Sequence, residues 1–313
     1  MSESLNVLSI PGFTNLGYRL HARDFAPIDV DLGDKTAVVT GSTGGLGLQA
    51  ARELAGLGAR VAIVGRSAAK IEDALGLLGN GALGFTADLS LMSAVRDVAD
   101  QMVDSMETID ILINNVGVLL QQREETSEGL EKTFATNLAG HFLLTNRLAG
   151  TLKESAPSRV INVSSGGMYT QRIDPDDLNS RAGPYSGKTA YARTKRGQVI
   201  LTEMWAERLS GSGVVVHAMH PGWAKTSGVA GSLPVFDKVM KPFLRTTGQG
   251  ADTMVWLAAA SEPGRSSGGF WFDREQVPTH ATDRTRVEDL ERKILWDRLV
   301  EITGEDLDQE PGG

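Results

Sequence analysis

Tyr191 and Lys195 lie four residues apart in the stretch YARTK, and this spacing suits proton transfer. In a helix, residues four apart share one face, so the ammonium would lie beside the phenol. A free tyrosine has a pKa of about 10, and a unit charge ~4 Å away at an effective dielectric of ~20 is worth roughly 4 kcal/mol, or about three pKa units. Such a tyrosine can exchange protons near neutral pH. The same spacing is common on solvated helix faces, so the surrounding elements decide between the two interpretations.

A glycine-rich stretch, TGSTGGLG, covers residues 40–47 and follows the β-branched apolar run KTAVVT at 35–40. Glycines there let the chain turn tightly and let backbone N–H groups at a helix N-terminus approach a pyrophosphate. No Lys-Ser/Thr pair follows the last glycine, so the loop is not a phosphate-transfer P-loop. The pattern predicts a dinucleotide site. Its predicted cofactor contacts are Gly41, Ser42, Thr43, Gly45, Leu46 and Gly47.

The residue after the second predicted strand, Arg66, bears on the choice of cofactor. An acid near this position usually grips the free 2′-hydroxyl of the NAD ribose, but the next acid in the chain is Glu72. An arginine suits the 2′-phosphate of NADP through charge-assisted hydrogen bonds. The sequence therefore favours NADP(H). The alternative, that Arg66 is a solvated loop residue, leaves NAD(H) open.

Apolar strands that alternate with helical patterns predict a parallel sheet covered by helices on both faces. The predicted strands are residues 35–40, 60–65, 83–85, 109–113, 159–163 and 214–219. The predicted helices are residues 46–57, 67–78, 91–106, 127–154, 187–210 and an amphipathic terminal helix at 286–303. We therefore expect an α/β fold, a single-domain Rossmann-type doubly wound parallel sheet flanked by helices.

No Pro/Gly/Ser-rich linker divides the chain, so we expect one domain with additions at its ends. An N-terminal extension covers 1–34, the dinucleotide-binding domain 35–275, and a tail with a helix 276–313. Two connections, 168–188 and 226–247, follow predicted strand ends, where ligands bind in open α/β sheets. Apolar residues recur through 226–247 and indicate a lid over a lipophilic substrate. The alternative is that they pack on the body of the fold.

Composition narrows the class of protein. The 313 residues are 41% hydrophobic and 22% charged, which is ordinary for a soluble globular protein. The net charge of −8 and the lack of a dense Lys/Arg run argue against a nucleic-acid partner. The chain has no cysteine, which excludes disulfides and thiolate chemistry and favours a reducing cytoplasm. No metal site is expected, because His217 and His220 have no acid at ligand spacing. With no apolar run near ~18 residues and no signal-peptide pattern, we expect a cytoplasmic protein without a transmembrane segment.

Several short motifs occur in one order between residues 35 and 260: TGSTGGLG, Asp88-Leu89, Asn114-Asn115-Val116-Gly117, Asn137, Ser164-Ser165, YARTK and Pro221-Gly222. Together they resemble the short-chain dehydrogenase/reductase superfamily. Its TGxxxGxG pattern matches here, and NNVG departs from the usual NNAG only at Val116. The stretches VSSGGM, MHPGWAKT, QGADTMVWLA and FWFDR resemble more narrowly one subgroup within the retinol-dehydrogenase-like branch.

The resemblance implies four catalytic residues: Ser165, Tyr191, Lys195 and Asn137. Tyr191 would be the general acid in carbonyl reduction or the base in alcohol oxidation, and Lys195 would lower its pKa and bond the nicotinamide ribose. Ser165 would polarise the substrate carbonyl, where charge develops. Asn137 would help position a proton-relay water near Lys195. For Asn137 the alternative is a buried kink or cap residue.

The resemblance also implies further cofactor contacts. Asp88 would contact the adenine, Asn115 the region beside the adenosine ribose, and Thr226 the nicotinamide carboxamide. The remaining implied contacts are Leu89, Gly117, Pro221 and Gly222. Asp88 has an alternative role as a cap of the following helix. Ser164 and Ser165 would point to opposite faces of the strand end, and we expect Ser165 to face the site.

We therefore expect an NADP(H)-dependent oxidoreductase that moves a hydride between the nicotinamide and a carbonyl or alcohol of a small lipophilic substrate. The alternative is a catalytically silent NADP(H)-binding sensor or scaffold on the same fold. The intact set of Ser165, Tyr191 and Lys195 counts against it. Relatives in this family commonly pair through the helices that carry Asn137 and Tyr191, so the resemblance implies a homodimer or homotetramer.

Overall fold

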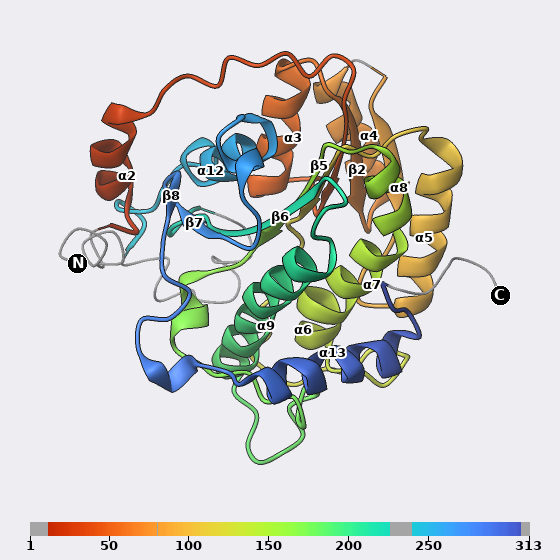
Figure 1. The fold of residues 1–313 in the computed structure, drawn as a ribbon, viewed down its shortest axis with the longest axis vertical. Coiled ribbons are helices and arrows are strands. Elements are labelled where there is room, and N and C mark those ends of the chain that lie inside the picture. The colour runs from red at the N-terminus through yellow and green to blue at the C-terminus, as the bar shows by residue number, and fades with distance from the viewer. Residues whose placement is uncertain (1–11, 80, 226–239, 308–313) are drawn as a thin grey trace.

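A central sheet lies between two layers of helices in the computed structural model of the chain (Figure 1). The structure describes residues 12–79, 81–225 and 240–307. In these ranges the sheet has eight strands in the order β3-β2-β1-β4-β5-β6-β7-β8. All neighbouring strands are parallel except the last pair. The strand order reverses between β1 and β4, which confirms the doubly wound fold and puts a ligand site at the carboxyl ends of these strands.

The predicted strands agree with β1 to β6 to within two residues at each end. The bounds are β1 Thr36–Thr40, β2 Arg60–Gly65, β3 Leu83–Thr86, β4 Ile111–Asn114, β5 Ser158–Val163 and β6 Val214–His220. Two more strands, β7 Phe270–Phe272 and β8 Glu275–Gln276, extend the sheet and were not predicted. They are too short to show a pattern of their own, and their place is given only by the pairing of β7 with β6 and of β8 with β7.

The helices of the described ranges are α2 Asn15–His21, α3 Gly45–Gly56, α4 Ala68–Leu78, α5 Met92–Ser105, α6 Lys132–Phe134, α7 Gly140–Arg147, α8 Ala149–Glu154, α9 Gly187–Arg208, α12 Thr247–Ala259 and α13 Asp289–Thr303. Short 3₁₀ segments cover Ala22–Asp24, Gly166–Tyr169, Pro263–Arg265 and Asp283–Thr285, and a π turn covers Ala135–Ala139. None of the described helices is both long and apolar enough to span a membrane. α2 and α12 were not predicted.

The single helix predicted at 127–154 is wrong. The Glu131 carboxylate accepts hydrogen bonds from the backbone N–H groups of Thr133 and Phe134, which starts the helix at Lys132 rather than at 127. The π turn then connects α6 to α7, and α8 follows separately. Apolar periodicity continues through all of these elements, so the sequence pattern does not reveal the breaks.

The strands are buried on both faces because neighbouring residues point to opposite layers. Val38 of β1 packs with α5, α7 and α9 residues in one core, whereas Val39 packs with α3, α4 and α12 residues in the other. These helices lie on opposite sides of the sheet in Figure 1. α13 closes the first core with Leu295, Trp296 and Leu299. The apolar runs of the strands therefore require covering helices on both faces.

The N-terminal segment packs on the body of the fold through one buried arginine, Arg245. Its guanidinium donates to the backbone oxygens of Gly12, at 2.8 Å, and of Phe13 and Thr14. It also pairs with Asp273 at 2.8 Å, and both side chains are only 1% exposed. His21 Nδ1 lies 2.8 Å from the same carboxylate. The division of the chain at residue 34 remains a prediction.

We expect Arg245→Met to lower the free energy of unfolding by about 3–5 kcal/mol, because it leaves the Asp273 carboxylate buried without its charged partner. Urea denaturation of the purified protein measures this loss. Arg286→Met is the matched control, since Arg286 pairs with Asp283 where their side chains are 70% and 90% exposed. The control should change the free energy of unfolding by less than about 1 kcal/mol. Equal losses in both variants would contradict a structural role for the buried pair.

Candidate active site

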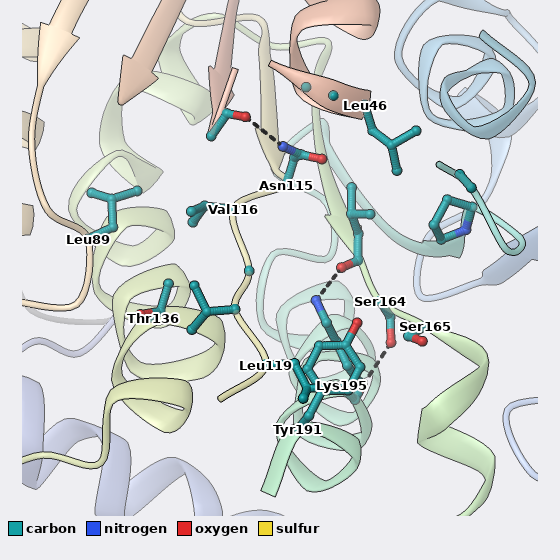
Figure 2. Close-up of a pocket in the computed structure, with 18 of the residues that line it drawn as sticks. Leu46, Leu89, Asn115, Val116, Leu119, Thr136, Ser164, Ser165, Tyr191 and Lys195 are labelled. Atoms are coloured by element: carbon teal, nitrogen blue, oxygen red, sulfur yellow. Dashed lines mark hydrogen bonds between the residues drawn. The ribbon is translucent and has the colours of Figure 1, made fainter. Parts of the chain in front are cut away.

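A cavity of about 700 Å³ opens where β1, β4, β5 and β6 end (Figure 2). Most of the predicted site residues line it. These are Gly41, Thr43, Gly45, Leu46, Gly47, Arg66, Asp88, Leu89, Asn115, Gly117, Ser165, Tyr191, Lys195, Pro221 and Gly222. The predicted contact Thr226 lies outside the described residues.

The glycine loop forms one wall of this cavity. Gly41 has φ +65°, a left-handed conformation that suits glycine. A Cβ on Gly47 would lie 2.5 Å from Asn115 Nδ2, whereas a Cβ on Gly44 would meet no atom within 4 Å. Space is therefore open beside the first turn of α3, where backbone N–H groups have no partner within the helix. This arrangement fits the phosphates of a dinucleotide.

Ser42 departs from the prediction because it does not line the cavity. Its hydroxyl donates to Val39 O at 2.5 Å and accepts from Val64 N at 3.3 Å, and the residue is fully buried. The side chain therefore joins β1 to β2 and is not available to a ligand. Two predicted contacts on the cavity wall also have structural bonds: Asn115 Nδ2 donates to Thr40 O at 2.8 Å, and Asp88 Oδ1 accepts from Ser90 N at 3.0 Å. The capping role considered for Asp88 and its place on the wall are compatible.

Two basic side chains lie at the β2 end of the cavity. Arg66 and Lys70 both line it and are both exposed. Neither forms an ion pair within the ranges that the structure describes. Lys70 was missed in the sequence, although its spacing of four residues from Arg66, across the start of the predicted helix, could have identified it. Together they provide a cationic end that suits an anionic group.

Tyr191, Lys195 and Ser165 meet on the opposite wall (Figure 2). The Ser186 hydroxyl caps α9, and the helix places Tyr191 and Lys195 on one face. Lys195 Nζ lies 5.5 Å from the centre of the Tyr191 ring and donates to Val163 O at 2.8 Å. The Ser165 and Tyr191 side chains line the same cavity, and Ser165 acts to lower the pKa of the Tyr191 hydroxyl. A hydroxyl pair and an ammonium therefore converge on one point of the cavity.

The two adjacent serines face different ways. Ser164 Oγ donates to Lys195 O at 2.9 Å and is almost fully buried, so it attaches the end of β5 to α9. Ser165 instead faces Tyr191, and its Oγ accepts from Gly167 N at 3.2 Å. The geometry agrees with the expectation that the second serine faces the site, as the alternation of strand residues requires.

The pKa values of the pair differ from the expectation. Burial raises the pKa of Tyr191, and the hydrogen bond with Ser165 acts in the opposite direction. Burial also lowers the pKa of Lys195 to about 7, so the ammonium is only partly charged near neutral pH. Lys195 is not among the groups that lower the pKa of Tyr191, and its ammonium bonds to Val163 O.

Asn137, which was predicted to be catalytic, does not line the cavity. It lies in the π turn and is fully buried. Its amide accepts from Val118 N at 2.8 Å and donates to Val118 O at 2.9 Å and to Thr194 Oγ1 at 3.2 Å. The side chain therefore holds the segment after β4 against α9.

The rest of the cavity wall is mixed: Lys132, Thr136, Thr170 and His220 line it together with several apolar residues. The apolar residues include Val118, Leu119, Trp223 and Leu244. Lys188 also lines the cavity, one turn before Tyr191. Of the predicted lid, residues 226–239 lie outside the described ranges.

Backbone bonds join the chain just before the predicted lid to Arg245, near the end of the lid. Lys225 N donates to Arg245 O at 3.0 Å, and Arg245 N donates to Trp223 O at 2.8 Å. This pairing forms an isolated parallel bridge between Ala224 and Arg245. The two ends of the lid segment therefore meet at one place.

Comparison with known proteins identifies the family. The short chain dehydrogenase family profile matches residues 35–173. The chain is 38% identical to human dehydrogenase/reductase SDR family member 12, with 86% of each chain covered. It is 34% identical to human retinol dehydrogenase 13, with 97% of this chain and 96% of the relative covered. The narrower resemblance seen in the sequence is confirmed by these relatives.

Solved structures give the same result. An uncharacterised protein from Mycobacterium paratuberculosis superposes with a TM-score of 0.74 at 29% identity, covering 92% of this chain and 98% of the other. Pseudomonas aeruginosa RhlG, in an NADP active-site complex, has a TM-score of 0.63 at 25% identity, covering 77% and 94%. With its doubly wound sheet, glycine loop and matching relatives, the chain belongs to the short-chain dehydrogenase/reductase family of NAD(P)(H)-binding oxidoreductases.

Proposed function

We propose that this protein is an NADP(H)-dependent oxidoreductase that interconverts a carbonyl and an alcohol on a lipophilic substrate. The observation that carries the proposal is that Ser165, Tyr191 and Lys195 line the same cavity as the glycine loop. A proton donor and a dinucleotide-binding loop on facing walls are the two parts that this reaction needs.

The residues of the cavity fit a nicotinamide dinucleotide. The open space beside Gly44 and the first turn of α3 would hold the pyrophosphate. Arg66 and Lys70 would bind a 2′-phosphate, which supports NADP(H) over NAD(H). When bound, the nicotinamide supplies or accepts the hydride. The choice rests on these two side chains, because similar solved structures include complexes with NADP and with NADH.

The hydroxyl groups of Tyr191 and Ser165 would both interact with the oxygen atom of the substrate. In reduction, the carbonyl carbon gains the hydride and Tyr191 gives its hydroxyl proton to the oxygen, so that an alcohol forms. Ser165 would donate a hydrogen bond to the same oxygen as negative charge develops there. In oxidation, the Tyr191 oxygen would take the proton back. Lys195, whose Nζ lies 5.5 Å from the centre of the Tyr191 ring, would bind the nicotinamide ribose beside that oxygen, as the resemblance implies.

The substrate end of the cavity supports a lipophilic molecule. Val118, Leu119, Trp223 and Leu244 offer apolar surface there. Among the relatives, retinol dehydrogenase 13 is named for a lipophilic alcohol. The cytoplasmic location and the homodimer or homotetramer remain predictions from composition and resemblance.

We expect Tyr191→Phe to lower kcat by at least about 100-fold, because the ring stays but the proton donor is lost. The dissociation constant for NADPH, measured by fluorescence titration, should change by less than about threefold, since the hydroxyl contributes at most one of many contacts. Turnover is measured with NADPH against a panel of aldehydes and ketones.

Tyr185→Phe is the matched control for this variant. The Tyr185 hydroxyl donates to Glu131 Oε1 at 3.0 Å, and the residue does not line the cavity. The control should keep turnover within about twofold of the wild type. Turnover by Tyr191→Phe at the wild-type rate would refute the mechanism. Wild-type protein that binds NADPH but turns over no compound of the panel would favour the sensor or scaffold.

We expect Arg66→Glu to raise the dissociation constant of NADPH about 10- to 100-fold, which corresponds to roughly 1.5–3 kcal/mol for a lost charge-assisted hydrogen bond. NADH, which has no 2′-phosphate, should change by less than about threefold. Arg60→Glu is the control, because it makes the same charge change at the opposite end of β2. Equal weakening of both cofactors by Arg66→Glu would show that this residue does not recognise the 2′-phosphate.

A further inference from the structure

A buried glutamine, Gln198, connects Lys195 to the π turn. Its Oε1 accepts from Lys195 Nζ at 3.2 Å. Its Nε2 donates to Asn137 O at 2.7 Å and bonds to His141 Nδ1 at 3.0 Å. Both protons of the amide nitrogen and one lone pair of its oxygen are therefore in use. Gln198 is 1% exposed and its neighbours are buried, so these bonds are made away from water.

The bonds of His141 fix the orientation of this amide. His141 Nε2 lies 2.9 Å from Val116 O, which can only accept, so Nε2 carries the proton. Nδ1 must then accept from Gln198 Nε2. Burial and the Lys195 charge lower the pKa of His141 to about 3, so the ring stays neutral and keeps this role. The amide oxygen is consequently directed at Lys195.

Gln198 spans the gap between Lys195 and the backbone of Asn137. The resemblance implies that Asn137 helps to position a relay water near Lys195. Here one side chain reaches from the Lys195 ammonium to the Asn137 carbonyl. An amide group does not exchange protons readily near neutral pH, because its N–H is a very weak acid and its oxygen a very weak base. Gln198 therefore holds this bridge in position without conducting protons along it.

We propose that Gln198 is a positioning residue that sets the place and the protonation of Lys195 through its bonds to Asn137 and His141. The role of Lys195 in turnover rests on the proposed function, whereas its titration does not. The Gln198 side chain presents a neutral amide oxygen to the Lys195 ammonium. This oxygen stabilises the positive charge less than a carboxylate would. A neutral acceptor is consistent with the pKa of Lys195, which burial lowers to about 7.

The groups that face Lys195 make the test specific. Tyr191 faces it from the same helix and His141 from α7, while β5 offers only the backbone oxygen of Val163. No charged side chain in the described ranges contributes to the pKa of Lys195, which burial alone lowers. Gln198→Glu would therefore place the first carboxylate in contact with this ammonium.

The experiment compares Gln198→Glu with Gln198→Met in the full-length protein. Nuclear magnetic resonance of protein labelled with ¹⁵N-lysine follows the titration of Lys195 without turnover, and Lys195→Met identifies the signal. We expect the pKa of Lys195 to rise by about one unit or more in Gln198→Glu, because an opposite charge favours the ammonium. It should fall below the wild-type value in Gln198→Met, because the ammonium loses an acceptor.

The pH profile of carbonyl reduction gives the second readout. Reduction needs a protonated Tyr191 and a charged Lys195, so kcat/KM should decrease as pH rises through the pKa of Lys195. The decrease should move to higher pH in Gln198→Glu and to lower pH in Gln198→Met. Asn146→Asp is the control, since it also buries a carboxylate near α9, bonded to Trp205, but makes no contact with Lys195. It should shift neither readout.

The outcomes of these experiments distinguish the positioning role of Gln198 from the proposed oxidoreductase function. Opposite shifts in the two Gln198 variants support the positioning role, and either variant remains informative if the other fails to fold. An unchanged titration of Lys195, or shifts in the same direction in both variants, would overturn it. Opposite shifts in the titration together with wild-type protein that catalyses no reduction would refute the proposed function and leave the positioning role intact.

Discussion

The burial of the Lys195 ammonium at the end of β5 is the constraint on which the site depends. A buried charge needs partners, and here a strand, a loop and the lysine's own helix all contribute to its surroundings. Val163 O binds it from β5, Gln198 Oε1 binds it from its own helix, and Gly117 lets the segment after β4 come close. Moving any of these elements would leave the ammonium unsatisfied. The position of Tyr191 follows, because it lies one turn away on the same helix.

Sequence reasoning identified the parts of this site that lie in local patterns. The glycine loop follows a β-branched strand, and YARTK lies within a long helix, so the local pattern of residues is enough to locate both. The strands β1 to β6 were predicted from continuous apolar runs. These features depend on neighbours in the chain, which a sequence displays directly. The order of motifs then indicated the family.

The features that were missed depend on contacts between distant segments. Ser42 appears in a glycine loop as a natural ligand contact, yet its hydroxyl bonds to Val39 and Val64. Asn137 has the family's expected position, but its amide is used to hold Val118. Lys70 and Gln198 carry no motif, and only folding brings them to the cavity or to Lys195. For such residues, the side-chain partners could not be read from spacing.

The backbone bridge between Ala224 and Arg245 affects how far the segment between them can vary, and with it the range of substrates, among proteins of this fold. Because the two ends of the intervening segment are fastened together, and Arg245 is itself held by Asp273, the anchorage does not depend on what the segment contains. Loops with closed ends tolerate changes of length and sequence better than segments that carry the sheet. Selection can therefore change the sequence between these two ends, while the glycine loop and the helix that carries Tyr191 and Lys195 stay unchanged.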